Sequence, residues 1–309
     1  MKLVSALLTC VLLVAPSLAQ EAPTSNSSSD DQGPTTTFKS NVKLVNVFTT
    51  VVNKRGAPVA GLKKEDFAIA EDGVPQDIKV FDRESELPLN IVLGIDTSLS
   101  TRKDIHLELE SARRFVHALL RPVDSLALYQ FSENVDELVP FTSNLQRIDK
   151  GIDHVRIGAA TALYDAIYLG SHSLADRNNR KVMVVITDGG DTVSKLDFND
   201  AVRAAQESEA IVYSIIIVPI EADAGRNVGG ENALIQLSND TGGKHYYASG
   251  VAQLDAAFHQ VSEELRTQYL IGYYPKKKLS DSDFRRIEVT LTDPNLDYKV
   301  RHRTGYYTK

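Results

Sequence analysis

The sequence has a single cysteine, Cys10, and this residue lies inside the apolar segment at the N-terminus. If that segment is removed after export, the mature chain has no thiol. Neither a disulfide framework nor a cysteine-ligated metal site can then form. An exported chain without cysteine is typical of a bacterial cell envelope.

Blocks of basic residues are missing as well. The 34 lysines and arginines are dispersed among 41 acidic residues, and the formal net charge is −7. We therefore expect no nucleic-acid partner. The seven histidines show no paired, metal-binding spacing. The sequence has neither a Gly-x-Ser-x-Gly nucleophile elbow nor a phosphate loop with Gly-Lys-Ser/Thr, so we do not expect an enzyme.

Long apolar runs occur only at the N-terminus. Lys2 precedes the apolar residues 3–16, and small residues follow at 17–19. This pattern predicts a signal peptide over residues 1–19, and an uncleaved membrane anchor is the alternative. No later segment is long and apolar enough to span a membrane, so we expect a secreted or cell-envelope protein, periplasmic or extracellular. Residues 20–38 are rich in Ser, Thr, Pro, Asp and Asn, which predicts a disordered linker.

Both ends of the remaining chain are typical of β structure. Residues 42–82 are rich in β-branched side chains and partly alternate between apolar and polar, and the segment after Gln268 contains three further strand patterns. We therefore predict one small β-rich module built from residues 39–87 and 269–309.

Residues 88–268 have a different sequence pattern. The apolar run 89–95 predicts a strand buried on both faces, and residues 126–131, 181–187 and 211–218 predict three further strands, of which 181–187 is the most apolar. Between and after them, apolar residues recur at helical spacing. Strands alternating with helices predict an α/β fold with a doubly wound, mostly parallel, Rossmann-like sheet.

Five polar residues are expected at the carboxyl ends of these strands, where open α/β sheets carry their sites. They are Asp96, Ser98, Ser100, Thr161 and Asp188. Two carboxylates and three hydroxyls form an all-oxygen donor set of the kind that hard cations require. With no thiolate and no histidine in these loops, zinc and copper are disfavoured.

This pattern resembles the von Willebrand factor A (VWFA) domains that carry a metal-ion-dependent adhesion site. The family motif is Asp-x-Ser-x-Ser, a distant Thr and a distant Asp in Thr-Asp-Gly. It matches residues 96–100, Thr161 and residues 187–189, although Ala159-Ala160 departs from the second glycine that is common before the Thr. The resemblance covers residues 88–268.

The resemblance implies a divalent cation, Mg²⁺ first and Mn²⁺ or Ca²⁺ as alternatives. It implies that Ser98, Ser100 and Thr161 bind this metal directly or nearly so, and that Asp96 and Asp188 act largely through water. An open coordination position would then accept an Asp or Glu from a protein partner, which implies metal-dependent adhesion.

The flanks resemble a bacterial family of secreted VWFA-related proteins described chiefly from acidobacteria. The matching segments are residues 61–67, 71–73 and 303–307. This second resemblance implies little about function.

Three other interpretations remain open. The Asp96 segment could be a turn that caps the next helix. Asp96 could be the nucleophile of a metal-dependent phosphohydrolase, although Ser98 stands where such enzymes place a second carboxylate. The chain could also be a structural envelope protein without a metal role. Nearby, we expect Asp191 to be a solvated loop acid and Asp165 to pack or cap a helix.

Overall fold

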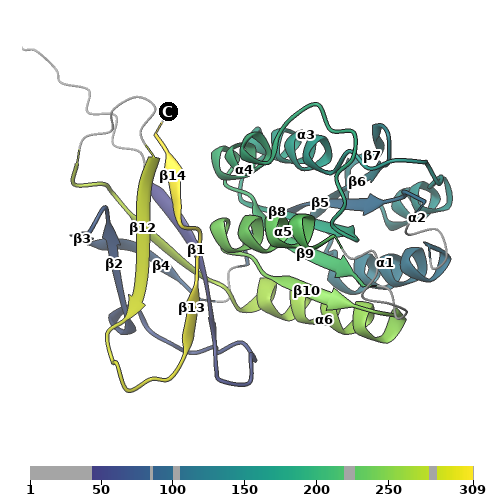
Figure 1. The fold of residues 1–309 in the computed structure, drawn as a ribbon. Helices are drawn as coiled ribbons and strands as arrows, with labels where there is room; N and C mark the ends of the chain where they lie inside the picture. The colour runs from purple at the N-terminus through teal and green to yellow at the C-terminus, as the bar shows by residue number, and fades with distance from the viewer. Residues whose placement is uncertain (1–43, 84–85, 100–104, 219–226, 278–283, 309) are drawn as a thin grey trace, which may run out of the picture. The chain divides into compact units, whose positions relative to one another are not determined.

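The computed structural model describes residues 44–83, 86–99, 105–218, 227–277 and 284–308 (Figure 1). They form one six-stranded sheet and two four-stranded sheets. The predicted α/β fold with a mostly parallel sheet and a β-rich flanking module is confirmed. The expected signal peptide and linker lie outside the described residues.

The central sheet has the strand order β10-β9-β8-β5-β6-β7. Its strands are β5 (Leu89–Asp96), β6 (Ser125–Phe131), β7 (Val135–Thr142), β8 (Arg180–Thr187), β9 (Ile211–Ile217) and β10 (His245–Ala248). All pairings are parallel except that between β6 and β7. The apolar runs predicted as strands form β5, β6, β8 and β9, and their side chains are almost all buried.

Six helices cover the two faces of this sheet. They are α1 (Ile105–Leu119), α2 (Leu145–Asp153), α3 (Leu163–Ala175), α4 (Phe198–Glu207), α5 (Val228–Asp240) and α6 (Val251–Thr267). The buried side chains of α1, α2 and α6 share one apolar cluster with the sheet. Those of α3, α4 and α5 share the cluster on the other face, as Figure 1 also shows.

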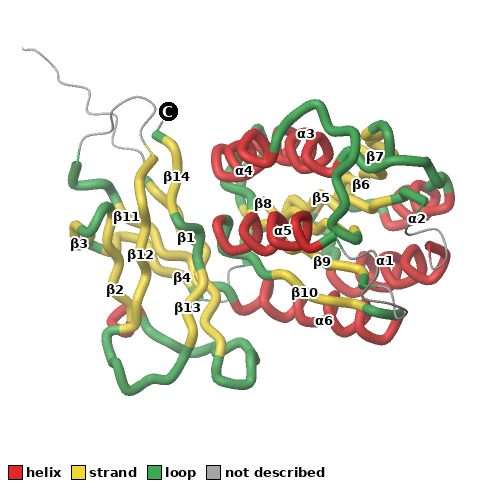
Figure 2. Tube along the Cα trace, viewed as in Figure 1, coloured by secondary structure: helices red, strands yellow, loops and turns green. Residues whose placement is uncertain are grey.

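The flanking module consists almost entirely of strands and loops (Figure 2). One sheet has the order β13-β1-β11-β4 and the other β14-β12-β2-β3. Their elements are β1 (Val45–Val52), the 3₁₀ turn η1 (Lys64–Asp66), β2 (Phe67–Glu71), β3 (Val74–Gln76), β4 (Ile78–Asp82), β11 (Tyr269–Tyr273), β12 (Phe284–Leu291), β13 (Lys299–Arg301) and β14 (Gly305–Tyr307). N-terminal strands pair with C-terminal strands, for example Val47 with Ile271. Side chains of both sheets share one apolar core.

A buried carboxylate organises this module. Glu71 accepts hydrogen bonds from the hydroxyls of Tyr273 at 2.7 Å and Tyr306 at 2.9 Å. The guanidinium of Arg285 lies 3.5 Å from the same carboxylate. These tyrosines therefore have a polar role, because a buried carboxylate is tolerated when it is paired and hydrogen-bonded.

Polar contacts also link the module to the α/β part. The buried Arg180 donates to Gln268, at 2.6 Å, and Gln268 donates to the hydroxyl of Thr50 on β1. Arg301 of β13 pairs with Glu264 of α6 at 2.5 Å. Among the described residues, no helix has both the length and the apolar character needed to cross a membrane.

Candidate metal site

The topology brings two of the predicted site segments together. Strands β5 and β8 are parallel neighbours, with Ile95 opposite Ile186. Their carboxyl ends therefore meet at the same edge of the sheet. Asp96 ends β5, and Asp188 directly follows β8.

Asp96 is held by hydrogen bonds on both oxygens. It is 1% exposed, Oδ1 accepts from the backbone N–H of Ser98 at 2.9 Å, and Oδ2 accepts from the hydroxyl of Thr187 at 2.7 Å. Burial raises the pKa of Asp96 to about 6, the hydrogen bonds oppose that rise, and the nearby Asp188 adds to it. A cation bound beside this carboxyl would favour its charged form.

Ser98 is buried and lies in the turn that its own N–H forms with Asp96. The described contacts of the Asp96 carboxylate go to Ser98 and Thr187. Ser100, the third residue of the motif, lies outside the described residues.

Thr161 lies in a loop that is bonded to the other two segments. Its N–H donates to the hydroxyl of Thr192 at 2.9 Å, and its carbonyl accepts from the N–H of Thr192 at 2.8 Å. In the same loop, Gly158 donates its N–H to the carbonyl of Thr97 at 2.8 Å. A Cβ at Gly158 would lie 2.3 Å from the side chain of Ser132, so this position requires glycine. The three site segments thus form a closed ring of mutual contacts.

The loop after β8 is also tightly fixed. Asp188 is partly exposed, and its carboxylate accepts from the N–H of Gly190 at 3.0 Å. Gly189 has a φ of +86°, and its N–H donates to Thr187 at 3.1 Å. A Cβ on Gly230 of α5 would come within 1.5 Å of the Gly189 carbonyl oxygen. The start of α5 therefore packs directly against the loop that presents Asp188.

Asp191 is not the solvated loop acid that the sequence suggested. Its Oδ1 accepts from the N–H of Leu163 at 2.8 Å and from the hydroxyl of Ser194 at 2.5 Å. Asp191 therefore satisfies an N-terminal donor of α3 from a distant loop. Asp165 accepts from the N–H groups of Lys195 and Leu196, which agrees with a packing or capping role. Because both contacts are non-local, no local sequence pattern reveals them.

The donor set fits a hard divalent cation. The described part of the chain places the carboxylates of Asp96 and Asp188 and the hydroxyls of Ser98 and Thr161 on neighbouring, mutually bonded segments. No cluster of three or more His, Cys, Asp or Glu suited to a metal occurs among the described residues. At this site, however, part of the ligand set consists of hydroxyl oxygens, which Ser98 and Thr161 would supply. All-oxygen donors are those that Mg²⁺, Mn²⁺ and Ca²⁺ prefer.

Large apolar side chains surround these segments, a feature that the sequence pattern did not reveal. Their exposed fractions are 54% for Leu99, 44% for Ile157, 44% for Val193 and 58% for Val228. Leu99 follows Ser98, and Ile157 precedes Gly158. Val193 donates its N–H to the carbonyl of Thr161, and Val228 begins α5. We call these four residues the apolar rim.

Comparisons with known proteins agree with the fold. Residues 91–190 match the family model described as von Willebrand factor type A domain. The solved structure of a von Willebrand factor type A protein from Catenulispora acidiphila aligns with a TM-score of 0.52 at 11% identity, over 86% of this chain and 75% of that one. Proximal thread matrix protein 1 from the mussel byssus aligns with a TM-score of 0.51 at 14% identity, over 63% of this chain and 51% of the other. A comparison with curated protein sequences found no significant match.

Proposed function

The chain contains a von Willebrand factor type A domain over residues 91–190, and from this premise we propose that it is an exported adhesion protein. It binds a divalent cation, Mg²⁺ first and Mn²⁺ or Ca²⁺ as alternatives, and uses this cation to hold a protein partner. The export signal over residues 1–19 directs it to the cell envelope or beyond. VWFA domains often mediate protein–protein interactions.

The observation that carries this proposal is the ring of hydrogen bonds around the predicted ligands. Thr187 bonds to Asp96, Thr97 to Gly158, and Thr161 to Thr192. Each bond joins two different segments of the site, so the donors are fixed relative to one another before any ligand arrives. Preorganised ligands lose little entropy when a cation binds.

The charge of the ligands explains why a partner carboxylate would bind. Ser98, Ser100 and Thr161 supply neutral hydroxyls to the cation, and Asp96 and Asp188 act mainly through water. The attraction between these two carboxylates and the metal is therefore weakened by distance. The cation stays electrophilic, and an Asp or Glu of the partner can replace one of its waters.

The geometry favours adhesion over a phosphohydrolase. Both oxygens of Asp96 already accept hydrogen bonds, and the residue is almost fully buried. A carboxylate in this state is a poor nucleophile, because it would have to give up those bonds to attack a phosphorus atom. Ser98 cannot act as the carboxylic acid that such a reaction requires. We therefore propose a binding protein in place of a phosphohydrolase.

A pull-down from envelope extract tests this function. The mature chain, residues 20–309, is immobilised and exposed to extract in Mg²⁺ or in EDTA. The wild type should retain a partner only in Mg²⁺, and Thr161→Ala should lose it. Thr290→Ala, on the exposed face of β12, is the matched control and should behave as wild type. Equal retention in EDTA would exclude the metal-dependent mechanism.

A further inference from the structure

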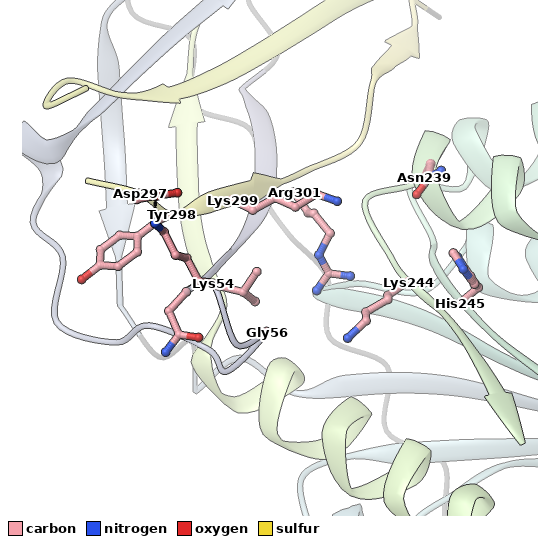
Figure 3. A pocket seen from close by; sticks show the side chains of 11 residues that line it. Lys54, Gly56, Asn239, Lys244, His245, Asp297, Tyr298, Lys299 and Arg301 are labelled. Atoms are coloured by element: carbon pink, nitrogen blue, oxygen red, sulfur yellow. Dashed lines mark ion pairs between the residues drawn. The ribbon is translucent and has the colours of Figure 1, made fainter. Parts of the chain in front are cut away.

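Figure 3 shows a polar pocket beside the start of β10. It lies at the amino ends of the parallel strands, whereas the candidate metal site lies at their carboxyl ends. His245 begins β10, whereas Asp96 and Thr187 end the strands β5 and β8 that run parallel in the same sheet. The pocket has a volume of about 420 Å³. Its walls come from the turn after β1, the end of α5, the start of β10 and residues 297–301.

Positive charge dominates this pocket. Lys54, Lys244, Lys299 and Arg301 line it. Lys54 pairs with Asp297, while Arg301 and Lys244 share one carboxylate, Glu264, at 2.5 and 3.7 Å. Within the described part of the chain, Lys299 makes no ion pair. Four cationic side chains therefore have two carboxylates as partners, which leaves an excess of positive charge.

Three of these cations are close enough to repel one another. Burial lowers the pKa of Lys244, the Glu264 carboxylate opposes that change, and Arg301 and Lys299 add to it. Burial also lowers the pKa of His245, and Lys244, Lys299 and Arg301 lower it further. A bound anion would relieve this repulsion, because it would add negative charge to that of the two carboxylates.

Part of the pocket is rigid. Glu264 is almost fully buried and fixes Arg301, whose guanidinium also donates to the carbonyl of Gly243 at 2.9 Å. Figure 3 shows Arg301 and Lys244 approaching each other from two different segments. Neutral groups complete the walls, namely Asn53, Asn239 and Tyr298. The Oδ1 of Asn53 accepts from the N–H groups of Arg55 and Ala57, so its amide NH₂ remains the donor toward a ligand.

We propose that this pocket binds a phosphate or sulfate ester of a sugar. Ammonium and guanidinium groups are the side chains that hold such oxyanions. The pocket is larger than a bare phosphate needs and lies within the range of small-molecule sites. The amides and the tyrosine suit the hydroxyls and apolar face of a sugar ring. This site is independent of the proposed metal-dependent function.

Isothermal titration calorimetry of the mature chain in low salt tests the proposal. The probes are glucose 6-phosphate, glucose 6-sulfate and glucose, each measured with EDTA present so that the metal site plays no part. We expect one or both esters to bind and glucose not to bind, and the stronger ester identifies the oxyanion. Equal heats for the esters and glucose would overturn the proposal. So would binding to anionic phospholipid vesicles without binding of either ester.

Charge variants make the test specific. Lys299 is exposed on the short strand β13, so its replacement should not disturb folding. Lys299→Ala should weaken ester binding about fivefold, the effect of one solvent-exposed ion pair, and Lys299→Glu should weaken it at least about twentyfold. Lys299→Arg should retain binding. Lys150→Ala, an exposed lysine on α2, is the control and should bind as wild type. Wild-type affinity in Lys299→Glu would show that the ester binds elsewhere and would overturn the assignment.

Discussion

The hydroxyl of Thr187 donates a 2.7 Å hydrogen bond to Oδ2 of Asp96 and so joins the ends of β8 and β5. The same hydroxyl oxygen accepts from the N–H of Gly189 at 3.1 Å. Thr187 thus connects the carboxylate of one site segment with the backbone of the next. All of its side chain is buried.

Thr187→Val removes this link while keeping the side-chain volume. We expect the free energy of unfolding to fall by about 1–3 kcal/mol, because buried polar groups lose a partner. Thr187→Ser should recover most of the loss. Urea unfolding measures the effect. Thr290→Val, at an exposed position of β12, is the control, and a Thr187→Val protein as stable as that control would contradict the prediction.

Divalent metal should stabilise the fold. At a hundredfold excess over the dissociation constant, Mg²⁺ that binds only the native state adds about 2.7 kcal/mol. For a chain of this size this corresponds to a rise of about 5–10 °C in Tm. Asp96→Ala and Asp188→Ala should each abolish the shift in a thermal melt. Asp176→Ala, an exposed position at the end of α3, should keep it. A wild-type melt unmoved by millimolar Mg²⁺ or Mn²⁺ would count against the site.

The sequence predicts what is encoded locally. Asp96 and Asp188 follow continuous apolar runs, so their place at the sheet edge follows from strand pattern and parallel topology. Strand β7 was not predicted, because its residues 135–142 carry two acids and a proline and lack a continuous apolar run. These features suit the exposed edge of a sheet, where β7 lies.

Long-range polar contacts, like strand β7, could not be predicted from the sequence. Asp191 bonds to the N–H of Leu163, and Glu71 accepts from Tyr273 and Tyr306, across stretches of chain with no common pattern. Exposure of the apolar rim is equally hidden, since a single apolar residue in a loop can be buried or exposed.

The contact between α5 and the Asp188 loop gives a steric prediction. Gly230→Ala would place a Cβ within 1.5 Å of the Gly189 carbonyl oxygen, so the loop or the helix must move. We expect a loss of about 1–3 kcal/mol in unfolding free energy, as for other overpacked sites, and a smaller Mg²⁺ shift in Tm. The neighbouring Gly229→Ala is the control. Its Cβ would meet nothing closer than 3.6 Å, so it should be neutral or slightly stabilising. Identical melts for the two variants would refute the argument.

His302 should make stability depend on pH. Its Nε2 accepts from the N–H of Val289 at 3.1 Å, and its Nδ1 lies 2.7 Å from the carbonyl oxygen of Arg303. The ring is therefore neutral, with its proton on Nδ1. Burial lowers the pKa of His302 from its ordinary value of 6.5.

The sign of the effect follows from this lowered pKa. The unfolded chain binds the proton at a higher pH than the folded chain does. The contribution of His302 is thus complete above pH 6.5 and is lost as the pH falls through the folded pKa. His302→Gln keeps an acceptor but does not titrate, so its unfolding free energy should fall less between pH 7 and pH 5 than that of the wild type. His259→Gln, on an exposed position of α6, is the matched control. Equal slopes for wild type and His302→Gln would contradict the prediction.

The apolar rim should contribute to partner binding without touching the metal. A single carboxylate on a cation is a small contact, and specific interfaces need a larger buried area. Leu99 and Val228 are more than half exposed in the free chain, so a partner that reaches the site would cover them. Covering part of a large apolar side chain is worth about 1 kcal/mol or more. Leu99→Ser and Val228→Ser should therefore each weaken partner binding about five- to tenfold, measured with the partner recovered in Mg²⁺. The Mg²⁺ shift in Tm should stay at the wild-type value, which would show that the loss of partner binding is not a loss of metal binding. Val123→Ser is the control. Val123 is 62% exposed but precedes the amino end of β6, whereas the candidate metal site lies at the carboxyl ends of the strands. If the rim variants bind as tightly as Val123→Ser does, the partner makes its apolar contacts elsewhere.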